Sequence, residues 1–335
     1  MARDDETRLF RPEDLLSRDE LAADAEGARS PAAVERDEDL DAAHMWISKD
    51  DGLLVRGVKP HSAQKSTLVS RGIDTVSFAM SGKWFAVKHG VQYVELYSGP
   101  GRLLDESTGV EQAGSPIRAL SVRKPFTHYV LSDFSQGCVD ALSARVGERT
   151  DVDIVRGDAN DPGHLERVAG LLNPRALIVA YLDPARPQDL RWTTVEYLAT
   201  KFGFIDLIIN LPLNSLMRAI LGAYRGGGRG PGAAGRFLNH ARPHDLLVPS
   251  VDRPNTAATI GAIRRHYDEQ LMALGFKPPA RRSINFPAVN PYYDILLISR
   301  HERGLDLWNK TNPLPVDPQL SLLLGDERDP PDEPD

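Results

Sequence analysis

Hydrophobic runs of strand length alternate with helix-like segments along the chain from residue 91 onward. Val/Ile/Leu-rich runs that predict strands cover residues 91–97, 128–131, 152–155, 176–182 and 205–209. Amphipathic patterns that predict helices lie between them, at residues 116–122, 136–146, 162–172 and 193–202. Near-continuous apolar strands separated by helices indicate a parallel sheet that is covered on both faces.

The pattern changes near the C-terminal end of this region. A helix is predicted near residues 260–274, followed by strand-like runs at 282–286 and 293–299 with a turn containing Pro and Asn between them. No crossover helix fits between these two runs, which favours an antiparallel pair. We therefore predict an α/β fold with a doubly wound, mostly parallel seven-stranded sheet and an antiparallel C-terminal strand pair. Such sheets bind ligands beyond the carboxyl ends of their strands, where the strand order reverses.

The composition divides the chain into four segments. Residues 1–45 form a charge-rich, acidic and weakly ordered extension, and residues 46–90 form a lead-in whose aromatic residues pack on the core. Residues 91–310 form the doubly wound domain, and residues 311–335 form an acidic, Pro-rich tail.

The net charge of −7 is unevenly distributed along these segments. Residues 1–50 hold 15 acidic and 7 basic residues, and residues 326–335 hold six acidic residues and one arginine. The intervening residues hold 26 acidic and 32 basic residues, a net charge of +6. A mildly basic body is compatible with a polyanionic substrate such as nucleic acid, although many ordinary domains carry a similar charge.

The composition also excludes several classes of protein. Cys138 is the single cysteine, which excludes a disulfide scaffold and a multi-cysteine metal site, and we expect it to be a buried structural thiol. No Cys-x-x-Cys spacing occurs, and no metal is predicted. Residues 1–8 are charged, unlike a secretory signal, and no apolar run approaches the roughly 18 residues that span a bilayer. We expect a cytoplasmic protein with no membrane partner.

The end of the first strand carries the most informative segment, Ser98-Gly99-Pro-Gly101. Gly99 and Gly101 permit a tight turn and a close backbone approach that side chains would block. Glu95, late on the strand, could orient backbone amides or the amino group of a ligand. The alternative is an ordinary turn after a strand.

Acidic residues at the next two strand ends favour a binding site over an ordinary turn. Asp133 follows the second strand, where a carboxylate can accept both hydroxyls of a ribose. Asp158, with Ala159 beside it, follows the third strand and could accept from an adenine amino group. No phosphate-binding Gly-Lys-Ser/Thr motif occurs in the sequence, and no Gly-x-Gly-x-x-Gly motif directly follows a predicted strand. S-adenosylmethionine (SAM) fits best, because it needs ribose, adenine and aminocarboxylate contacts but no pyrophosphate cradle.

Taken together, these segments resemble the three-Cys-motif partner proteins (TcmP). The matching segments are residues 93–102, 114–120, 157–160, 181–184, 206–212 and 292–308. The resemblance covers roughly residues 80–310, and it implies a Rossmann-like fold of the class I methyltransferase type. It also implies association with a separate three-cysteine-motif protein, of which this chain would be the partner. The sequence departs from the family at Tyr97-Ser98, where Phe-Ala is more usual, and after Pro184, where the family has an aromatic residue.

The end of the fourth strand is the predicted reaction site. Enzymes that methylate exocyclic amines of bases place Asp/Asn-Pro-Pro-aromatic there, where an oxygen accepts from the amine and the ring stacks on the base. Asp183 and Pro184 supply an acceptor and a stiff turn, but no ring follows, and Arg186 could stack or bind a phosphate instead. The alternative is that Asp183 and Pro184 only terminate the strand.

Two further residues could contact a substrate. Asn210, at the end of the fifth strand, could point its amide into the crevice or could simply cap the strand. Arg218, in the next helix, could reach an anion or form a surface salt bridge. A Gly/Arg-rich loop at residues 225–236 could follow phosphates, but a tolerated insertion is favoured.

The sequence therefore supports three hypotheses. The first is a SAM-dependent methyltransferase that acts on nucleic acid, on a DNA or RNA base. The second is a non-catalytic partner whose methyltransferase-like fold docks a three-cysteine-motif protein. The third and weaker one is a nucleic-acid-binding module without chemistry.

Overall fold

The computed structural model describes residues 44–59, 61–84, 89–226, 232–250, 254–286 and 289–311. Nearly all of the acidic extension predicted at 1–45, the tail from residue 312 and positions 227–231 of the Gly/Arg loop lie outside the described residues. Within the described ranges, no helix combines the length and the apolar character needed to cross a membrane.

Seven strands form the main sheet in the order β10-β11-β9-β8-β3-β6-β7. Their bounds are β3 Val91–Glu95, β6 His128–Asp133, β7 Val152–Arg156, β8 Leu177–Leu182, β9 Ile205–Leu211, β10 Ala280–Phe286 and β11 Val289–Ile298. The first five are parallel, whereas β11 pairs antiparallel with both β9 and β10. The strand order reverses beside β3, and this order is that of the class I methyltransferase fold. The predicted fold class is confirmed.

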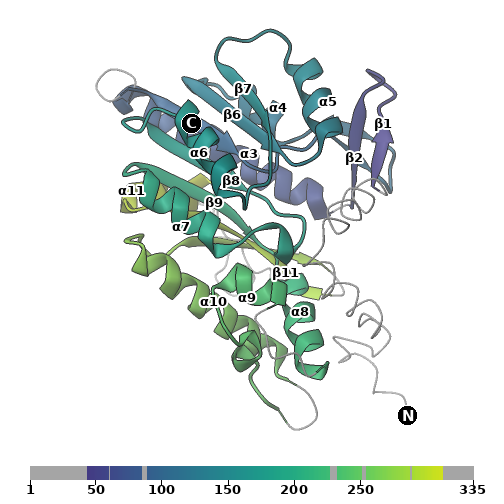
Figure 1. Ribbon diagram of the computed structural model, residues 1–335, viewed down its shortest axis with the longest axis vertical. Coiled ribbons are helices and arrows are strands. Elements are labelled where there is room, and N and C mark those ends of the chain that lie inside the picture. Colours follow the sequence, from purple (N-terminus) through teal and green to yellow (C-terminus); the bar gives the residue numbers. More distant parts are fainter. Residues whose placement is uncertain are drawn as a thin grey trace, which may run out of the picture.

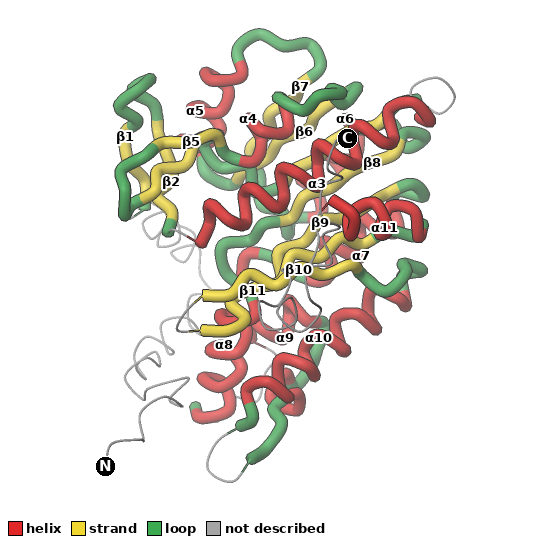
Figure 2. The backbone as a smooth tube through the Cα atoms, turned by 180° about the vertical axis from the view of Figure 1, so that it is seen from behind, coloured by secondary structure: helices red, strands yellow, loops and turns green. Residues whose placement is uncertain are grey.

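Helices cover both faces of this sheet (Figures 1 and 2). One face carries α6 Pro162–Leu171, α7 Trp192–Lys201, α8 Leu213–Arg225, α9 Gly232–Leu238 and α10 Thr256–Ala273. The other face carries α3 His61–Trp84, α4 Ser115–Leu120, α5 Gln136–Val146 and α11 Glu302–Thr311. Two short 3-10 helices, η3 Pro187–Asp189 and η4 Pro243–Leu246, lie in the loops.

The alternation of side chains along the strands builds a separate core on each face. Val94 and Val130 point to the core under α6–α10, whereas Tyr93 and Tyr129 point to the core under α3, α4, α5 and α11. Polar caps fix where several helices begin. For example, the Ser135 side chain accepts from Cys138 N at the start of α5.

A second sheet of four short strands was not predicted. It has the order β1-β2-β4-β5, with bounds β1 Met45–Ile47, β2 Leu54–Val58, β4 Arg102–Asp105 and β5 Glu111–Ala113. β1 and β2 come from the lead-in, and β4 and β5 form a hairpin directly after the glycine turn. β2 and β4 pair in parallel, which joins the lead-in to the hairpin. This second sheet therefore lies next to the glycine turn.

Candidate functional site

The turn after β3 has a backbone conformation that requires glycine. Gly99 and Gly101 have φ angles of +58° and +87°, in the left-handed region. A Cβ at Gly101 would also lie only 2.8 Å from Leu142 Cδ1 of α5. Ser98 is buried and its N–H donates to Ser132 O at 2.9 Å, which joins the turn to β6.

Asp133, the last residue of β6, joins this turn to helix α5. Its side chain is largely buried; Oδ2 accepts from Gly99 N at 2.7 Å and Oδ1 accepts from Ser135 N at 2.9 Å. The carboxylate lies where a ligand on the glycine turn could reach it.

The loop after β7 is tied to the loop after β8. Asp158 is exposed and Oδ1 accepts from Asn160 N at 2.8 Å, whereas Ala159 is buried. The Asn160 amide donates to Asp189 O at 2.8 Å and accepts from Arg191 N at 2.7 Å. These contacts fix the backbone on either side of the predicted adenine contacts.

Glu95 lies at the centre of the site and is fully buried. Its carboxyl group binds the hydroxyls of Tyr93 at 2.9 Å and Ser115 at 2.5 Å. The pKa of Glu95 is raised to about 8, chiefly by burial. The hydrogen bonds from the two hydroxyls lower this pKa, and the negative charges of Asp183 and Asp133 raise it further. Glu95 therefore carries a proton at neutral pH, and it lies close enough to Asp183 and Asp133 to feel both charges.

Tyr97 provides a similar link to the loop after β8, the fourth strand. Its hydroxyl donates to Asp189 O at 2.7 Å. Burial raises the pKa of Tyr97 well above its usual value, and the charges of Asp189, Asp158 and Asp133 add to this effect. The acidic residues predicted at the ends of the strands are thus brought near one another.

Asp183, just after β8, accepts four hydrogen bonds from this chain's own side chains. Lys65 Nζ, from α3, lies 2.9 Å from Oδ1 and 2.6 Å from Oδ2. Tyr181 OH donates to Oδ2 at 2.9 Å, and Asn210 Nδ2 donates to Oδ1 at 2.8 Å. Both members of the ion pair are mostly buried, with 19% of Lys65 and 18% of Asp183 exposed. Lys65 Nζ also lies 5.6 Å from the centre of the Tyr293 ring.

The two predicted substrate-binding arginines have different surroundings. Arg186 is paired with Asp189, with 3.1 Å between Nη2 and Oδ1, and this pair caps η3. Arg218 lies in α8 and is half-buried, and its side chain has no hydrogen bond or ion pair to any described residue.

Sequence reasoning missed four polar residues of this network. Tyr93 and Tyr181 each lie two positions before an acid, Glu95 or Asp183, on neighbouring strands. Because side chains two apart share one face of a strand, the repeated Tyr-x-acid pattern could have revealed both. Ser115 and Lys65 have no such local signal, since Lys65 lies 118 positions before its partner.

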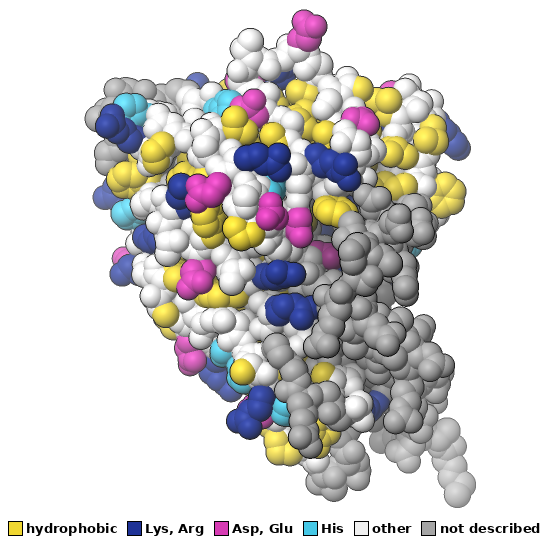
Figure 3. Space-filling view, viewed as in Figure 1, with side chains coloured by type: hydrophobic (Ala, Val, Ile, Leu, Met, Phe, Trp, Pro, Cys, Tyr) yellow, Lys and Arg dark blue, Asp and Glu magenta, His cyan; other side chains and the backbone are white. Residues whose placement is uncertain are grey.

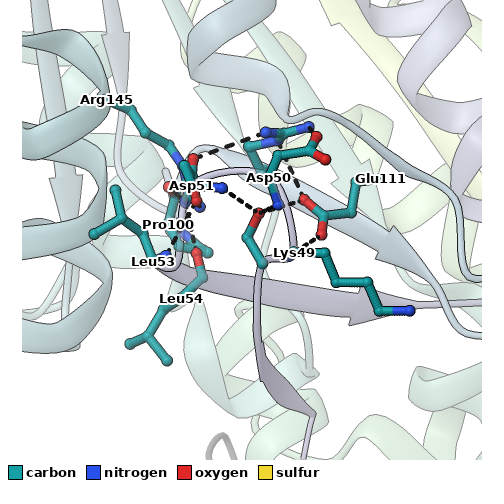
Figure 4. Close-up of polar contacts among 10 residues, drawn as sticks. Lys49, Asp50, Asp51, Leu53, Leu54, Pro100, Glu111 and Arg145 are labelled. Atoms are coloured by element: carbon teal, nitrogen blue, oxygen red, sulfur yellow. Dashed lines mark hydrogen bonds and ion pairs between the residues drawn. The ribbon is translucent and has the colours of Figure 1, made fainter.

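A cluster of charged residues clamps the small sheet onto the glycine turn (Figure 4). Arg145 of α5 forms an ion pair with Asp51, with 2.8 Å between Nε and Oδ2, and donates to Leu54 O and Pro100 O at 2.5 Å. The hydrogen bond from Arg145 holds the pKa of Asp51 well below its usual value. A cavity of about 300 Å³ lies here, lined by Asp51, Arg102, Ala113, Ile117 and Arg145.

The described residues were also searched for a metal site and for a reactive cysteine. No group of three or more His, Cys, Asp or Glu side chains that could hold a metal ion occurs among those that the structure describes. Cys138 is buried at the start of α5, and burial raises the pKa of its thiol to about 11, with the Asp133 charge adding to this effect. The position of Cys138 agrees with a structural thiol.

Comparison with known proteins finds no matching family model and no matching curated protein. The resemblance to three-Cys-motif partner proteins therefore has no support from these searches. Several solved structures match at low similarity. A Legionella pneumophila protein of the family DUF519 has a TM-score of 0.40 and 12% identity, over 72% of this chain and 90% of that one.

Two further matches are to named methyltransferase-fold proteins. Aeropyrum pernix fibrillarin, solved with natively bound S-adenosyl-L-methionine, has a TM-score of 0.36 and 14% identity, over 68% of this chain and 76% of that one. A putative RNA methyltransferase from Pyrococcus horikoshii has a TM-score of 0.31 and 11% identity, over 68% of this chain and 83% of that one. At this level the likeness concerns the fold alone, which the strand order already defines.

Proposed function

We propose that this protein binds SAM at the carboxyl ends of β3, β6 and β7 and is a SAM-dependent methyltransferase whose acceptor is a nucleic acid. The observation that carries the proposal is the convergence of the glycine turn with Glu95, Asp133 and Asp158 beside the point where the strand order reverses. Bound SAM supplies an electrophilic methyl group.

The residues at these strand ends match the parts of SAM. Asp133 would accept from the ribose hydroxyls, and the open backbone of Gly99 would face the aminocarboxylate. Asp158 and Ala159 would contact the adenine. Phe134, directly after Asp133, is exposed and offers a ring on which the adenine could stack.

Two neighbouring arginines support a polyanionic acceptor. Burial lowers the pKa of Arg236 in α9, and the nearby charge of Arg191 adds to this effect, so the two guanidinium groups lie close together. Neither forms a side-chain ion pair with a described residue. Lys and Arg side chains are also visible across the middle of the face that Figure 3 shows, which is the face seen in Figure 1. Cations brought together without carboxylate partners are typical of a surface that follows phosphates.

Calorimetric titration with SAM tests the cofactor assignment. We expect binding to the wild type and at least about tenfold weaker binding to Asp133→Asn, because a charged acceptor of the ribose hydroxyls is lost. Asp140→Asn is the matched control, since Asp140 lies on the exposed side of α5 and its carboxylate accepts a hydrogen bond from the Gln136 amide alone among the described side chains. No heat at millimolar SAM, or equal affinities for the wild type and Asp133→Asn, would refute the assignment.

One observation favours the alternative of a non-catalytic partner. The side chains of Trp46 and Ile47 on β1 and of Val110 beside β5 are exposed apolar groups on the small sheet, where another protein could dock. If this protein docks a three-cysteine-motif protein without catalysis, the two proteins would copurify and the complex would persist in Asp133→Asn. Copurification that is lost in Trp46→Ser but retained in Asp133→Asn, without any SAM binding, would favour this alternative.

A further inference from the structure

The carboxylate of Asp183 has no acceptor position left for an incoming amine. Its two oxygens accept four hydrogen bonds, two from Lys65 and one each from Tyr181 and Asn210. A carboxylate offers about four acceptor positions, so all are in use. An exocyclic amine of a base could bind Asp183 only by displacing one of these donors.

One donor and one acceptor remain beside Asp183. The Lys65 ammonium has three N–H groups, of which two are directed at the Asp183 oxygens. The Asn210 amide donates through Nδ2, but its Oδ1 is buried and has no partner among the described residues. Both Lys65 and Asn210 bind Asp183 Oδ1, so the remaining donor and acceptor belong to one small region.

The orientation of the Asn210 amide follows from this contact. Turning the amide over would place Oδ1 against the Asp183 carboxylate, where two acceptors would repel each other. Oδ1 therefore stays unpaired, and a buried acceptor without a donor is costly. Asn214, at the start of α8, has a second buried amide oxygen without a partner in the described part of the chain. Unpartnered acceptors at the end of β9 indicate that a ligand with a hydrogen-bond donor binds there.

A hydroxyl group is complementary to this pair. It can donate its proton to Asn210 Oδ1 and accept from the third N–H of Lys65. A base amine could donate to Asn210, but its lone pair is delocalised into the ring and accepts poorly from Lys65. Charge development favours the hydroxyl as well. An ammonium stabilises an oxygen that becomes negative as its proton leaves, whereas it repels a nitrogen that becomes positive on methylation.

We infer that the methyl acceptor is a hydroxyl group and, given the nucleic-acid acceptor proposed above, the ribose 2′-hydroxyl of RNA. The inference rests on the proposed function, and DNA has no 2′-hydroxyl. The acceptor oxygen bonds to the methyl carbon while the methyl–sulfur bond breaks, and the electron pair of that bond stays on sulfur. The hydroxyl proton leaves Asn210 Oδ1, its acceptor in the bound state, for a solvent water, and nothing is oxidised or reduced. Lys65 holds the oxygen and stabilises its developing charge, and Asp183 positions Lys65.

The chemical position of the transferred methyl group is the direct test. The full chain is incubated with tritium-labelled SAM and either unmodified RNA transcripts (transfer RNA, ribosomal RNA and a random pool) or DNA of the same sequences. The RNA is then hydrolysed in alkali. A 2′-O-methyl group removes the nucleophile that cleaves the next phosphodiester bond, so the label should remain in dinucleotides. Label in mononucleotides, label in DNA, or no label in any RNA despite SAM binding would each overturn the inference.

Lys65 variants provide a second readout that does not depend on turnover. We expect Lys65→Met to bind SAM as the wild type does, to lose transfer at least about a hundredfold, and to bind fluorescent RNA about tenfold more weakly in the presence of S-adenosylhomocysteine. Lys65→Arg keeps the positive charge, so it should retain part of the methyl transfer and part of the RNA affinity that Lys65→Met loses. Lys201→Met is the control, because Lys201 forms an exposed ion pair with Glu166 between α7 and α6.

The failures of the two proposals are distinguishable. Without SAM binding by the wild type, the proposed function fails and this inference with it. If SAM binds and Lys65→Met retains transfer and RNA affinity, Lys65 has only a structural role and the hydroxyl assignment is wrong. The alkali analysis uses the wild type, so it decides the matter even if Lys65→Met fails to fold.

Discussion

At the scale of single residues, the site depends on two tyrosine–acid pairs that lie side by side. Tyr93 and Glu95 belong to β3, Tyr181 lies opposite Glu95 on β8, and Asp183 follows directly. The two acids have opposite surroundings. Glu95 is fully buried and binds two hydroxyl groups, and burial raises its pKa, whereas Asp183 forms an ion pair with Lys65.

The raised pKa of Glu95 predicts a pH-dependent stability. The folded pKa is about 8, against 4.5 for the unfolded chain, so the folded state binds the extra proton between these values. The stabilisation is complete below pH 4.5 and is lost as the pH rises through 8. Between pH 6.5 and 8.5 we expect the wild type to lose about 2 kcal/mol more unfolding free energy than Glu95→Gln. Urea denaturation at the two pH values measures this difference. If the wild type and Glu95→Gln lost the same unfolding free energy between these pH values, Glu95 would be ionised in the folded state.

The glycine turn predicts a graded cost of substitution. Gly101 and Gly109 both have positive φ angles, but only Gly101 has a neighbour that a Cβ would strike. Gly109→Ala should cost about 1 kcal/mol through backbone strain alone. Gly101→Ala should cost about 2–4 kcal/mol, because Leu142 must also move. Thermal unfolding of the two variants tests this; equal losses would show that α5 yields easily at Leu142.

At the scale of elements, one arginine ties the small sheet to the glycine turn. Arg145 is almost fully buried, and it joins Asp51 of the lead-in to the carbonyl groups of Leu54 and Pro100. The clamp therefore links three segments that are distant in sequence.

Removing this clamp should affect both stability and ligand binding. We expect Arg145→Met to lower the free energy of unfolding by about 2–3 kcal/mol, because Asp51 and two carbonyl groups lose a charged donor. SAM affinity should fall as well, since Pro100 is no longer held. Arg149→Met is the control: Arg149 follows α5 and forms an exposed pair with Asp151, which should contribute less than about 1 kcal/mol. Similar losses in the two variants would refute the clamp.

The elements also show how far the sequence predicts this structure. The strands and helices of the main sheet were predictable, because each buries a periodic apolar face. The small sheet was not, because β1 and β5 have three residues each and are largely half-exposed. Glu95 and Asp133 were identifiable as candidates because polar ends of buried strands meet at one edge. The contact of Lys65 with Asp183 was not, since nothing in the sequence indicates which turn of α3 faces β8.

At the scale of the whole molecule, charge is separated along the chain. The acidic ends account for the negative net charge, whereas the body between them is basic. A basic body predicts nucleic-acid binding that weakens as salt rises, because bound phosphates release counterions.

The salt dependence of RNA binding tests this picture. For about three phosphate contacts, affinity should fall about tenfold or more between 50 and 200 mM salt. Arg236→Ala should reduce the slope of log affinity against log salt by about 0.7. Arg303→Ala is the control, since Arg303 is exposed on α11, which covers the opposite face of the sheet. Fluorescence anisotropy supplies the slopes, and a wild-type slope near zero would exclude binding through phosphates.

Because β2 pairs with β4, the segment that contains the seven-stranded sheet is not a complete structural unit without the lead-in. Arg56, Gly57 and Val58 form a ladder with Leu103, Leu104 and Asp105, next to the glycine turn. A fragment that begins at β3 would keep every strand of the large sheet, but it would lack this ladder, the Asp51 end of the clamp and Lys65. During synthesis, β2 can therefore pair only after the β4–β5 hairpin has been made, and the ligand-binding edge of the sheet is complete only then.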